Sequence, residues 1–238
     1  DPSTNSYRSK TAPRPNRGVI TEKGMEALVR AVEERKKELG KEIGMAIECG
    51  TGFALSDAIK FAKAVESYNP IWLEDLITGD YHPYVQADLY KKLTDSTTCP
   101  IHTGEQIYLR ENFKELIENK AVRVLGPDPA DMGGIAELKW VAEYADLHSI
   151  QIAPHGIGDG VFGLAAQVQA GAAMPENYIA FEYPVIRDKW WLDITDGLPD
   201  PIVKDGLIKV WDKPGIGIDF IEKKAKKFLP DEDKDFFD

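Results

Sequence analysis

The sequence predicts an α/β fold built from repeated strand–helix units, of the kind that closes into a (β/α) TIM-type barrel. Short apolar runs recur along the chain, and five of them end in an acidic residue or a histidine, at spacings of 23 to 31 residues. One such spacing holds a strand, a loop, a helix and a return loop, and functional groups of parallel α/β folds lie at strand C-termini. The five residues are Glu48 in MAIECG, Glu74 in IWLEDL, Glu105 in IHTGEQ, Asp128 in VRVLGPDP and His155 in IQIAPHG.

Length and charge limit the classes of protein that this chain can be. Its 238 residues suffice for one large domain with a complete core, and its apolar runs continue without a linker. The formal net charge of −11 argues against nucleic acid and anionic membrane surfaces as partners. No apolar stretch reaches the roughly 20 residues of a membrane helix, and from the first residues we expect no signal peptide. We therefore expect no nucleic-acid or membrane partner.

The cysteines indicate the cellular compartment. Only Cys49 and Cys99 occur, so the chain has no disulfide framework, and we expect a cytoplasmic protein. Cys49 directly follows Glu48, where we expect a small buried side chain that fills space rather than a reactive thiol.

Composition and periodicity divide the chain into three parts. Residues 1–20 are rich in Pro, Ser, Asn, Arg and Lys without a hydrophobic period, which predicts a polar loop. Residues 21–220 form the expected barrel domain, and 221–238 a charged C-terminal tail. The domain begins with a helix that Thr21 opens and that ends near Gly40, because apolar residues recur there at helical spacing.

Strands and helices alternate through the rest of the domain. The expected strands are 43–48, 71–74, 99–104, 121–126, 150–154 and 178–182. The helices between them are 57–68 capped by Ser56, a helix ending at Leu93, 112–117, 134–147 and 160–173. The stretch 206–220 is typical of a terminal β-hook. A closed barrel needs two more strands, so the chain is either an open sheet or a piece of a barrel whose first strands lie elsewhere.

The acidic strand ends indicate a metal site. Three or four carboxylates gathered at one edge of a sheet repel each other strongly unless a cation neutralises them. A divalent metal is therefore expected there, with a histidine beside it.

The motifs WLED, TGEQ, PDPADMGGI, APHG and PGIGID occur in order and at barrel spacing. In them the chain from Glu22 to Asp219 resembles the barrel domain of the enolase superfamily, in its mandelate racemase subgroup. The resemblance implies the C-terminal portion of a (β/α) barrel, with about six strands present. It places the first strands and an N-terminal capping domain outside this chain.

The resemblance also implies a ligand set for one magnesium ion. In that family, acids at the ends of the third, fourth and fifth barrel strands hold the metal, and Glu48, Glu74 and Glu105 match them. The first of these is usually Asp, so Glu48 departs from the pattern by one methylene. Manganese, which tolerates a shifted ligand more readily than magnesium, is the alternative ion.

Catalytic and substrate-binding residues follow from the same resemblance. His155 and Asp128 match a catalytic dyad, in which the carboxylate fixes one imidazole tautomer and raises its basicity. Glu182 in AFEY matches an acid that donates a hydrogen bond to a substrate carboxylate when protonated. His102, and Tyr81 and His82 on the loop after the second strand, are candidates for binding substrate.

The implied activity is dehydration of a sugar acid. A base removes the proton α to a carboxylate, the β-hydroxyl leaves, and an aldonate or aldarate becomes a 2-keto-3-deoxy acid. The alternative enzyme is a racemase or epimerase of a carboxylic acid, and a catalytically silent relative is a further possibility. A hydrolase or phosphatase on an open α/β sheet is disfavoured, because phosphate loops and a nucleophile elbow are absent. We expect a homo-oligomer that binds a small carboxylate substrate.

Overall fold

The computed structural model describes residues 19–50, 53–77, 85–156, 160–183 and 190–237. Its centre is a five-stranded parallel sheet in the order β1-β2-β3-β4-β5. The strands are β1 (Ala46–Glu48), β2 (Trp72–Glu74), β3 (Ile101–Thr103), β4 (Val124–Leu125) and β5 (Gln151–Ile152). Each strand pairs with the next one along the chain, as repeated βα units predict.

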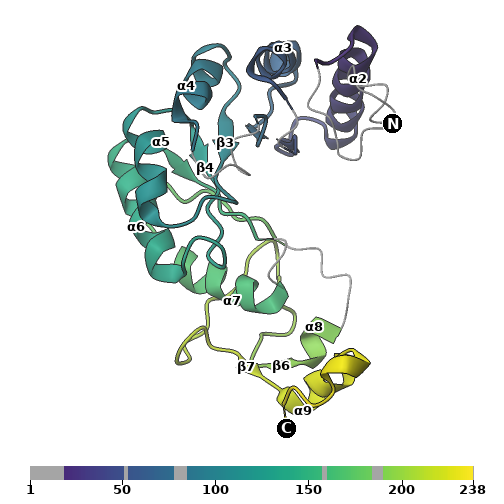
Figure 1. The fold of residues 1–238 in the computed structure, drawn as a ribbon, viewed down its shortest axis with the longest axis vertical. Helices are drawn as coiled ribbons and strands as arrows, with labels where there is room; N and C mark the ends of the chain where they lie inside the picture. The colour runs from purple at the N-terminus through teal and green to yellow at the C-terminus, as the bar shows by residue number, and fades with distance from the viewer. Residues whose placement is uncertain (1–18, 51–52, 78–84, 157–159, 184–189, 238) are drawn as a thin grey trace.

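Helices cover one side of this sheet. They are α2 (Glu22–Leu39), α3 (Leu55–Val65), α4 (Ala87–Asp95), α5 (Lys114–Glu118), α6 (Ile135–Leu147) and α7 (Gly160–Gly171), with short 3₁₀ helices η1 (Glu66–Tyr68) and η2 (Arg110–Phe113). Figure 1 shows them as an arc with the strands on its inner side, which is the arrangement of part of a barrel.

The helix boundaries follow local chemistry. The Thr21 hydroxyl accepts a hydrogen bond from the backbone N–H of Gly24 at 3.0 Å, and Gly40 ends α2 with a left-handed φ of 68°, as the sequence predicts. The expected cap at Ser56 is wrong, because α3 begins at Leu55 and its N-cap position is Ala54.

The core lies between sheet and helices. Leu73, Ile101, Leu125 and Ile152, one from each of four adjacent strands, are fully buried. The apolar faces of the helices cover this row, so burial fixes the register of the strands and brings their C-termini to one edge.

The sixth expected strand, 178–182, does not form. Tyr178 makes an isolated parallel bridge with Ile152, and the amide of Glu182 donates to the carbonyl of Pro154 at 3.0 Å. Pro154 has no N–H, so it cannot donate the next hydrogen bond that a regular parallel ladder requires. The segment nevertheless runs beside β5 and brings Glu182 to the same edge as the other strand ends.

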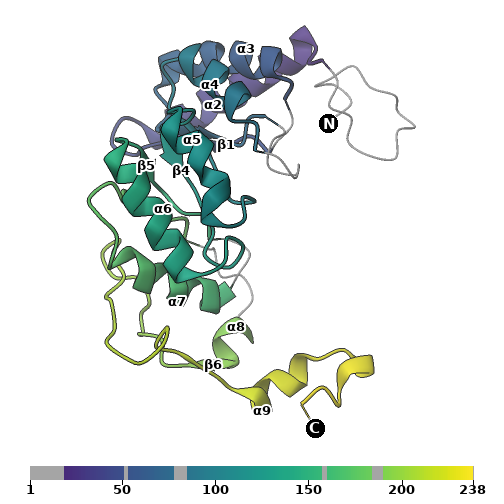
Figure 2. The ribbon, with the colours of Figure 1, turned by 60° about the vertical axis from the view of Figure 1, so that its left-hand side comes forward.

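The C-terminal part of the chain extends beyond the sheet (Figures 1 and 2). It contains α8 (Trp190–Asp193), an antiparallel pair of β6 (Thr195–Asp196) with β7 (Asp219–Phe220), α9 (Glu222–Ala225), η3 (Lys226–Phe228) and η4 (Asp231–Asp233). At the start of the expected β-hook, Leu207 forms a single antiparallel bridge with Lys204, which lies just before the segment, and β7 closes it. Every helix among the described residues is too short or too polar to cross a membrane.

Candidate functional site

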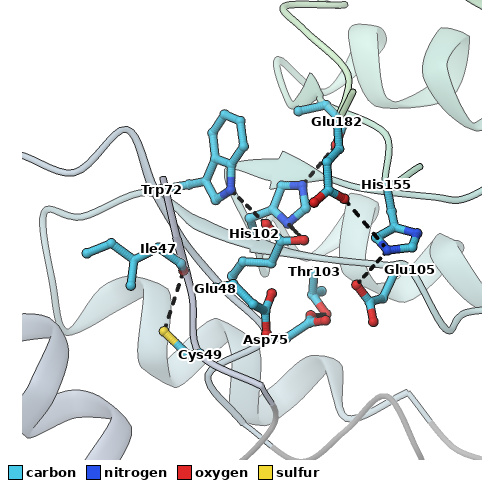
Figure 3. A network of polar contacts seen from close by, with 12 residues as sticks. Ile47, Glu48, Cys49, Trp72, Asp75, His102, Thr103, Glu105, His155 and Glu182 are labelled. Atoms are coloured by element: carbon cyan, nitrogen blue, oxygen red, sulfur yellow. Dashed lines mark hydrogen bonds and ion pairs between the residues drawn. The ribbon is translucent and has the colours of Figure 1, made fainter. Parts of the chain in front are cut away.

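Acidic and histidine side chains meet at the C-terminal edge of the sheet. Glu48 and Glu74 end β1 and β2 and stand opposite each other in the parallel register. Glu105, Asp128 and His155 follow β3, β4 and β5 within three residues, and Glu182 lies on the segment beside β5. Figure 3 shows how the labelled side chains of this group face one another.

Four carboxylates form the centre of the site. Glu48, Glu74, Asp75 and Glu105 each offer an oxygen, and these four oxygens all lie within 4.8 Å of one another. Carboxylates so close repel one another, and a divalent cation among them removes that repulsion. Carboxylate oxygens are also the ligands that Mg²⁺ and Mn²⁺ prefer. The donor set therefore fits the expected ion.

Glu48 is the most exposed member of the cluster, because β1 forms an edge of the sheet in the described residues. Its carboxylate turns back and accepts a hydrogen bond from the backbone N–H of Gly50. The extra methylene of Glu, relative to the Asp that the resemblance led us to expect, is accommodated by this turn.

Nitrogen atoms lie beside both oxygens of Glu74. The indole N–H of Trp72, two residues earlier on β2, donates to Oε2 at 3.0 Å. Nδ1 of His102, the β3 residue opposite Glu74, lies 3.4 Å from Oε1. The rings of His102 and Trp72 stack with their centroids 5.1 Å apart. A glycine at position 126 gives the His102 ring room, because a Cβ there would overlap Cε1 and Nε2 of that ring.

Asp75 belongs to the cluster although we did not predict it from the sequence. Side chains alternate along a strand, so the residue after Glu74 is expected to point away from the site. Its backbone instead has a left-handed φ of 47°, which ends the alternation and turns the buried carboxylate toward Glu74 and Glu105. The only signal in the sequence is the adjacent pair of acids in WLED.

Asp128 and His155 form a hydrogen-bonded pair beside this cluster. Nδ1 of His155 lies 2.6 Å from Oδ2 of the buried Asp128. The other oxygen of Asp128 accepts from the backbone N–H of Ala130 at 2.8 Å, which fixes the orientation of the carboxylate. Gln167 on α7 donates to the backbone carbonyl of His155 and fixes the loop. The second ring nitrogen of His155 is therefore the one that faces the site.

That nitrogen, Nε2, lies between two acids. It is 3.5 Å from Oε2 of Glu105 and 3.6 Å from Oε2 of Glu182. Burial opposes protonation of His155, but the hydrogen bond to Asp128 and the charges of Glu105 and Glu182 outweigh it. Together they raise the pKa of His155 to about 9. Without a cation, the ring is therefore protonated at neutral pH.

The surroundings of Glu182 raise the pKa of its carboxyl group. Burial, with a contribution from the charge of Glu74, raises the pKa of Glu182 against the opposing charge of His155. The side chain of Glu182 is partly exposed and borders the site beside β5.

The remaining predicted residues divide into two groups. His102 is almost fully buried, and its Nε2 lies 3.0 Å from the carbonyl oxygen of Ala153. It supports Glu74 in this structure, and a contact with substrate stays a prediction. Tyr81 and His82 lie outside the described residues. Burial and nearby carboxylates raise the pKa of the Cys49 thiol well above its usual value, which agrees with an unreactive side chain.

Comparison with known protein families gives one match over most of the chain. Residues 10–224 match the model of the enolase C-terminal domain-like family. A D-xylonate dehydratase of Haloferax volcanii is 32% identical over 190 residues, which are 80% of this chain and 44% of that protein.

Solved structures share the fold. A mandelate racemase/muconate lactonizing enzyme-like protein from Rubrobacter xylanophilus matches with a TM-score of 0.82 at 30% identity, over 94% of this chain and 55% of that one. An enolase from Pantoea ananatis with bound D-gluconate and Mg matches with a TM-score of 0.80 at 27% identity, over 96% and 53%. The chain thus spans about half the length of the relatives that it matches.

Proposed function

The chain belongs to the enolase superfamily, in the C-terminal domain family of the mandelate racemase and muconate lactonizing enzymes, and we propose that it acts as a magnesium-dependent sugar-acid dehydratase. The reaction would remove water from an aldonate or aldarate and give a 2-keto-3-deoxy acid. One observation carries the proposal: an acid–base pair, Asp128 and His155, lies beside a four-carboxylate cluster that suits a divalent cation.

The relatives support the substrate class. One is named a D-xylonate dehydratase, and one solved structure holds D-gluconate together with Mg. Both compounds are aldonates, which carry a carboxylate, an α-hydrogen and a β-hydroxyl. We therefore place aldonates first among the substrates of this protein.

Glu48, Glu74 and Glu105 would hold the cation. When bound, it would lower the energy of the negative charge that develops on a substrate carboxylate as the α-proton leaves. The hydrogen bond from Trp72 orients the carboxylate of Glu74 before the ion binds, so less reorganisation is needed on binding.

His155 would transfer protons through Nε2, because Asp128 occupies Nδ1. The α carbon–hydrogen bond breaks and its electron pair forms the new double bond, while the β carbon–oxygen bond breaks and the hydroxyl leaves as water. One imidazole serves both transfers when the α-hydrogen and the β-hydroxyl lie on the same face of the substrate. The enol that forms then becomes the 2-keto acid by tautomerisation.

Glu182 would bind an oxygen of the substrate carboxylate. A protonated carboxyl group donates a hydrogen bond, and the raised pKa of Glu182 favours that form. The donated bond strengthens as negative charge accumulates on the carboxylate oxygen during the reaction.

Proton NMR in deuterated water, with Mg²⁺ and a panel of aldonates and aldarates that includes D-xylonate and D-gluconate, tests this function. Loss of the α-proton signal together with new 3-deoxy methylene signals supports dehydration and identifies the substrate. Exchange of the α-proton without elimination would replace the proposal with a racemase or epimerase. No reaction across the panel, with metal bound, would favour a silent relative.

A further inference from the structure

Two buried hydroxyl groups, those of Thr103 and Tyr90, form a chain of hydrogen bonds that ends at Asp75 of the acidic cluster. Thr103, the last residue of β3, has its Oγ1 2.6 Å from Oδ1 of Asp75. The phenolic oxygen of Tyr90 on α4 lies 2.9 Å from the same Oγ1. Tyr90, Thr103 and Asp75 are each at most 1% exposed, so this chain of hydrogen bonds is shielded from solvent.

The direction of these hydrogen bonds follows from the donors available. An ionised carboxylate only accepts hydrogen bonds, so the single hydroxyl proton of Thr103 must point to Asp75. Oγ1 of Thr103 then acts as the acceptor for the hydroxyl of Tyr90. The Tyr90 hydroxyl therefore points at Thr103 and the Thr103 hydroxyl at Asp75, and each hydrogen bond strengthens the other in this buried environment.

The backbone conformation of Asp75 also directs its side chain toward the acidic cluster. Its amide donates to the carbonyl of His102 at 3.1 Å while its φ is 47°. A left-handed backbone costs free energy for residues other than glycine, and such positions concentrate at functional sites. The side chain that results lies within 4.8 Å of the Glu48, Glu74 and Glu105 oxygens. Figure 3 shows Asp75 and Thr103 on the Glu48 and Glu105 side of the network.

We propose that Asp75 is a fourth carboxylate that holds the cation, and that Thr103 and Tyr90 are positioning residues for it. This inference rests on the metal site of the proposed function and adds to it a residue and its support. Thr103 fixes which way the carboxylate faces, and Tyr90 fixes the Thr103 hydroxyl. Neither hydroxyl needs to touch substrate.

Binding of Mn²⁺, followed by electron paramagnetic resonance in the absence of substrate, tests the inference without reference to activity. Thr103→Val should weaken Mn²⁺ binding by about 10- to 100-fold, the usual effect of losing a partner of a metal ligand. Asp75→Asn, which replaces the ligand itself, should weaken it by more. Tyr90→Phe should weaken it less, because Thr103 keeps its bond to Asp75. Thr103→Ser retains the hydroxyl and should bind Mn²⁺ almost as well as the unaltered protein.

Thr94 provides a matched control. It is also a buried threonine, and its hydroxyl donates to the carbonyl of Ala121 at 2.6 Å, away from the acidic cluster. Thr94→Val should lose a similar amount of folding stability and keep its Mn²⁺ affinity. Thermal unfolding in the presence of a chelator checks that all variants are folded.

The outcomes separate this inference from the proposed function. Unchanged Mn²⁺ affinity in Asp75→Asn or Thr103→Val would overturn the inference and leave the other three ligands in place. An equal loss in Thr94→Val and Thr103→Val would also overturn it, because the effect would then be one of general destabilisation. Failure of the unaltered protein to bind Mn²⁺ would overturn both proposals.

Discussion

Nε2 of His155 lies 3.5 Å from Oε2 of Glu105. This contact joins the two halves of the site, because Glu105 belongs to the carboxylate cluster and His155 to the pair with Asp128. A substrate carboxylate bound at the cluster would therefore present its α-carbon close to the nitrogen that exchanges protons.

Loss of a central carboxylate should abolish metal binding. Glu74→Gln and Glu105→Gln should each reduce Mn²⁺ affinity by more than the roughly 10- to 100-fold that loss of an outer-shell partner costs. Isothermal titration calorimetry measures this, with Glu143→Gln as a control because Glu143 is an exposed partner of Lys139 on α6. Near-normal affinity in either site variant would remove that residue from the ligand set.

Trp72→Phe should weaken the metal site without emptying it. Phenylalanine keeps an aromatic ring against His102 but lacks the N–H that holds Oε2 of Glu74. We expect Mn²⁺ affinity to fall by about 10-fold, as for other residues that orient a ligand. Trp140→Phe on α6 is the matched control, since Trp140 packs against Arg110 away from the cluster. Equal affinities for the two variants would mean that the indole does not orient Glu74.

Gly126→Ala should displace His102. The added Cβ would overlap the His102 ring, so we expect a loss of about 1–3 kcal/mol in the free energy of unfolding. Urea unfolding of Gly126→Ala, His102→Ala and the double variant forms a double-mutant cycle. The cost of Gly126→Ala should shrink strongly when His102 is already alanine. Additive costs would show that the overlap is relieved in another way.

The stability of the chelated protein should depend on pH through His155. Its pKa is about 9 in the folded protein and close to 6.5 when unfolded, so the folded state binds the proton more tightly. The resulting stabilisation is complete below about pH 6.5 and is lost as the pH rises toward 9. The melting temperature should therefore fall more steeply across this range than that of His155→Asn. Parallel curves for the two proteins would contradict the raised pKa.

Much of the site was predictable because each functional residue ends an apolar run. Glu48, Glu74 and Glu105 could be placed at one edge from their spacing alone, since parallel strands joined by helices align their C-termini. The sequence could not show that Pro154 interrupts the ladder with 178–182, because that depends on which backbone group faces the neighbouring segment.

The supporting residues were harder to predict. Asp75 reaches the cluster through a left-handed backbone, which its adjacency to Glu74 does not reveal. The interior position of His102 depends on Gly126, which lies on the neighbouring strand end and leaves space for the ring. Thr103 and Tyr90 look like ordinary strand and helix residues, and only tertiary packing brings their hydroxyl groups together.

Catalysis by His155→Asn at full metal occupancy tests the central claim most directly. With the best substrate from the panel, α-proton exchange and formation of the 3-deoxy product would be followed by proton NMR in deuterated water, after calorimetry has shown normal Mn²⁺ binding. We predict that both rates fall by at least the roughly 10²- to 10⁴-fold contribution of a general acid–base group. Dehydration at an undiminished rate, with metal still bound, would contradict the assignment of His155 as the residue that moves the proton.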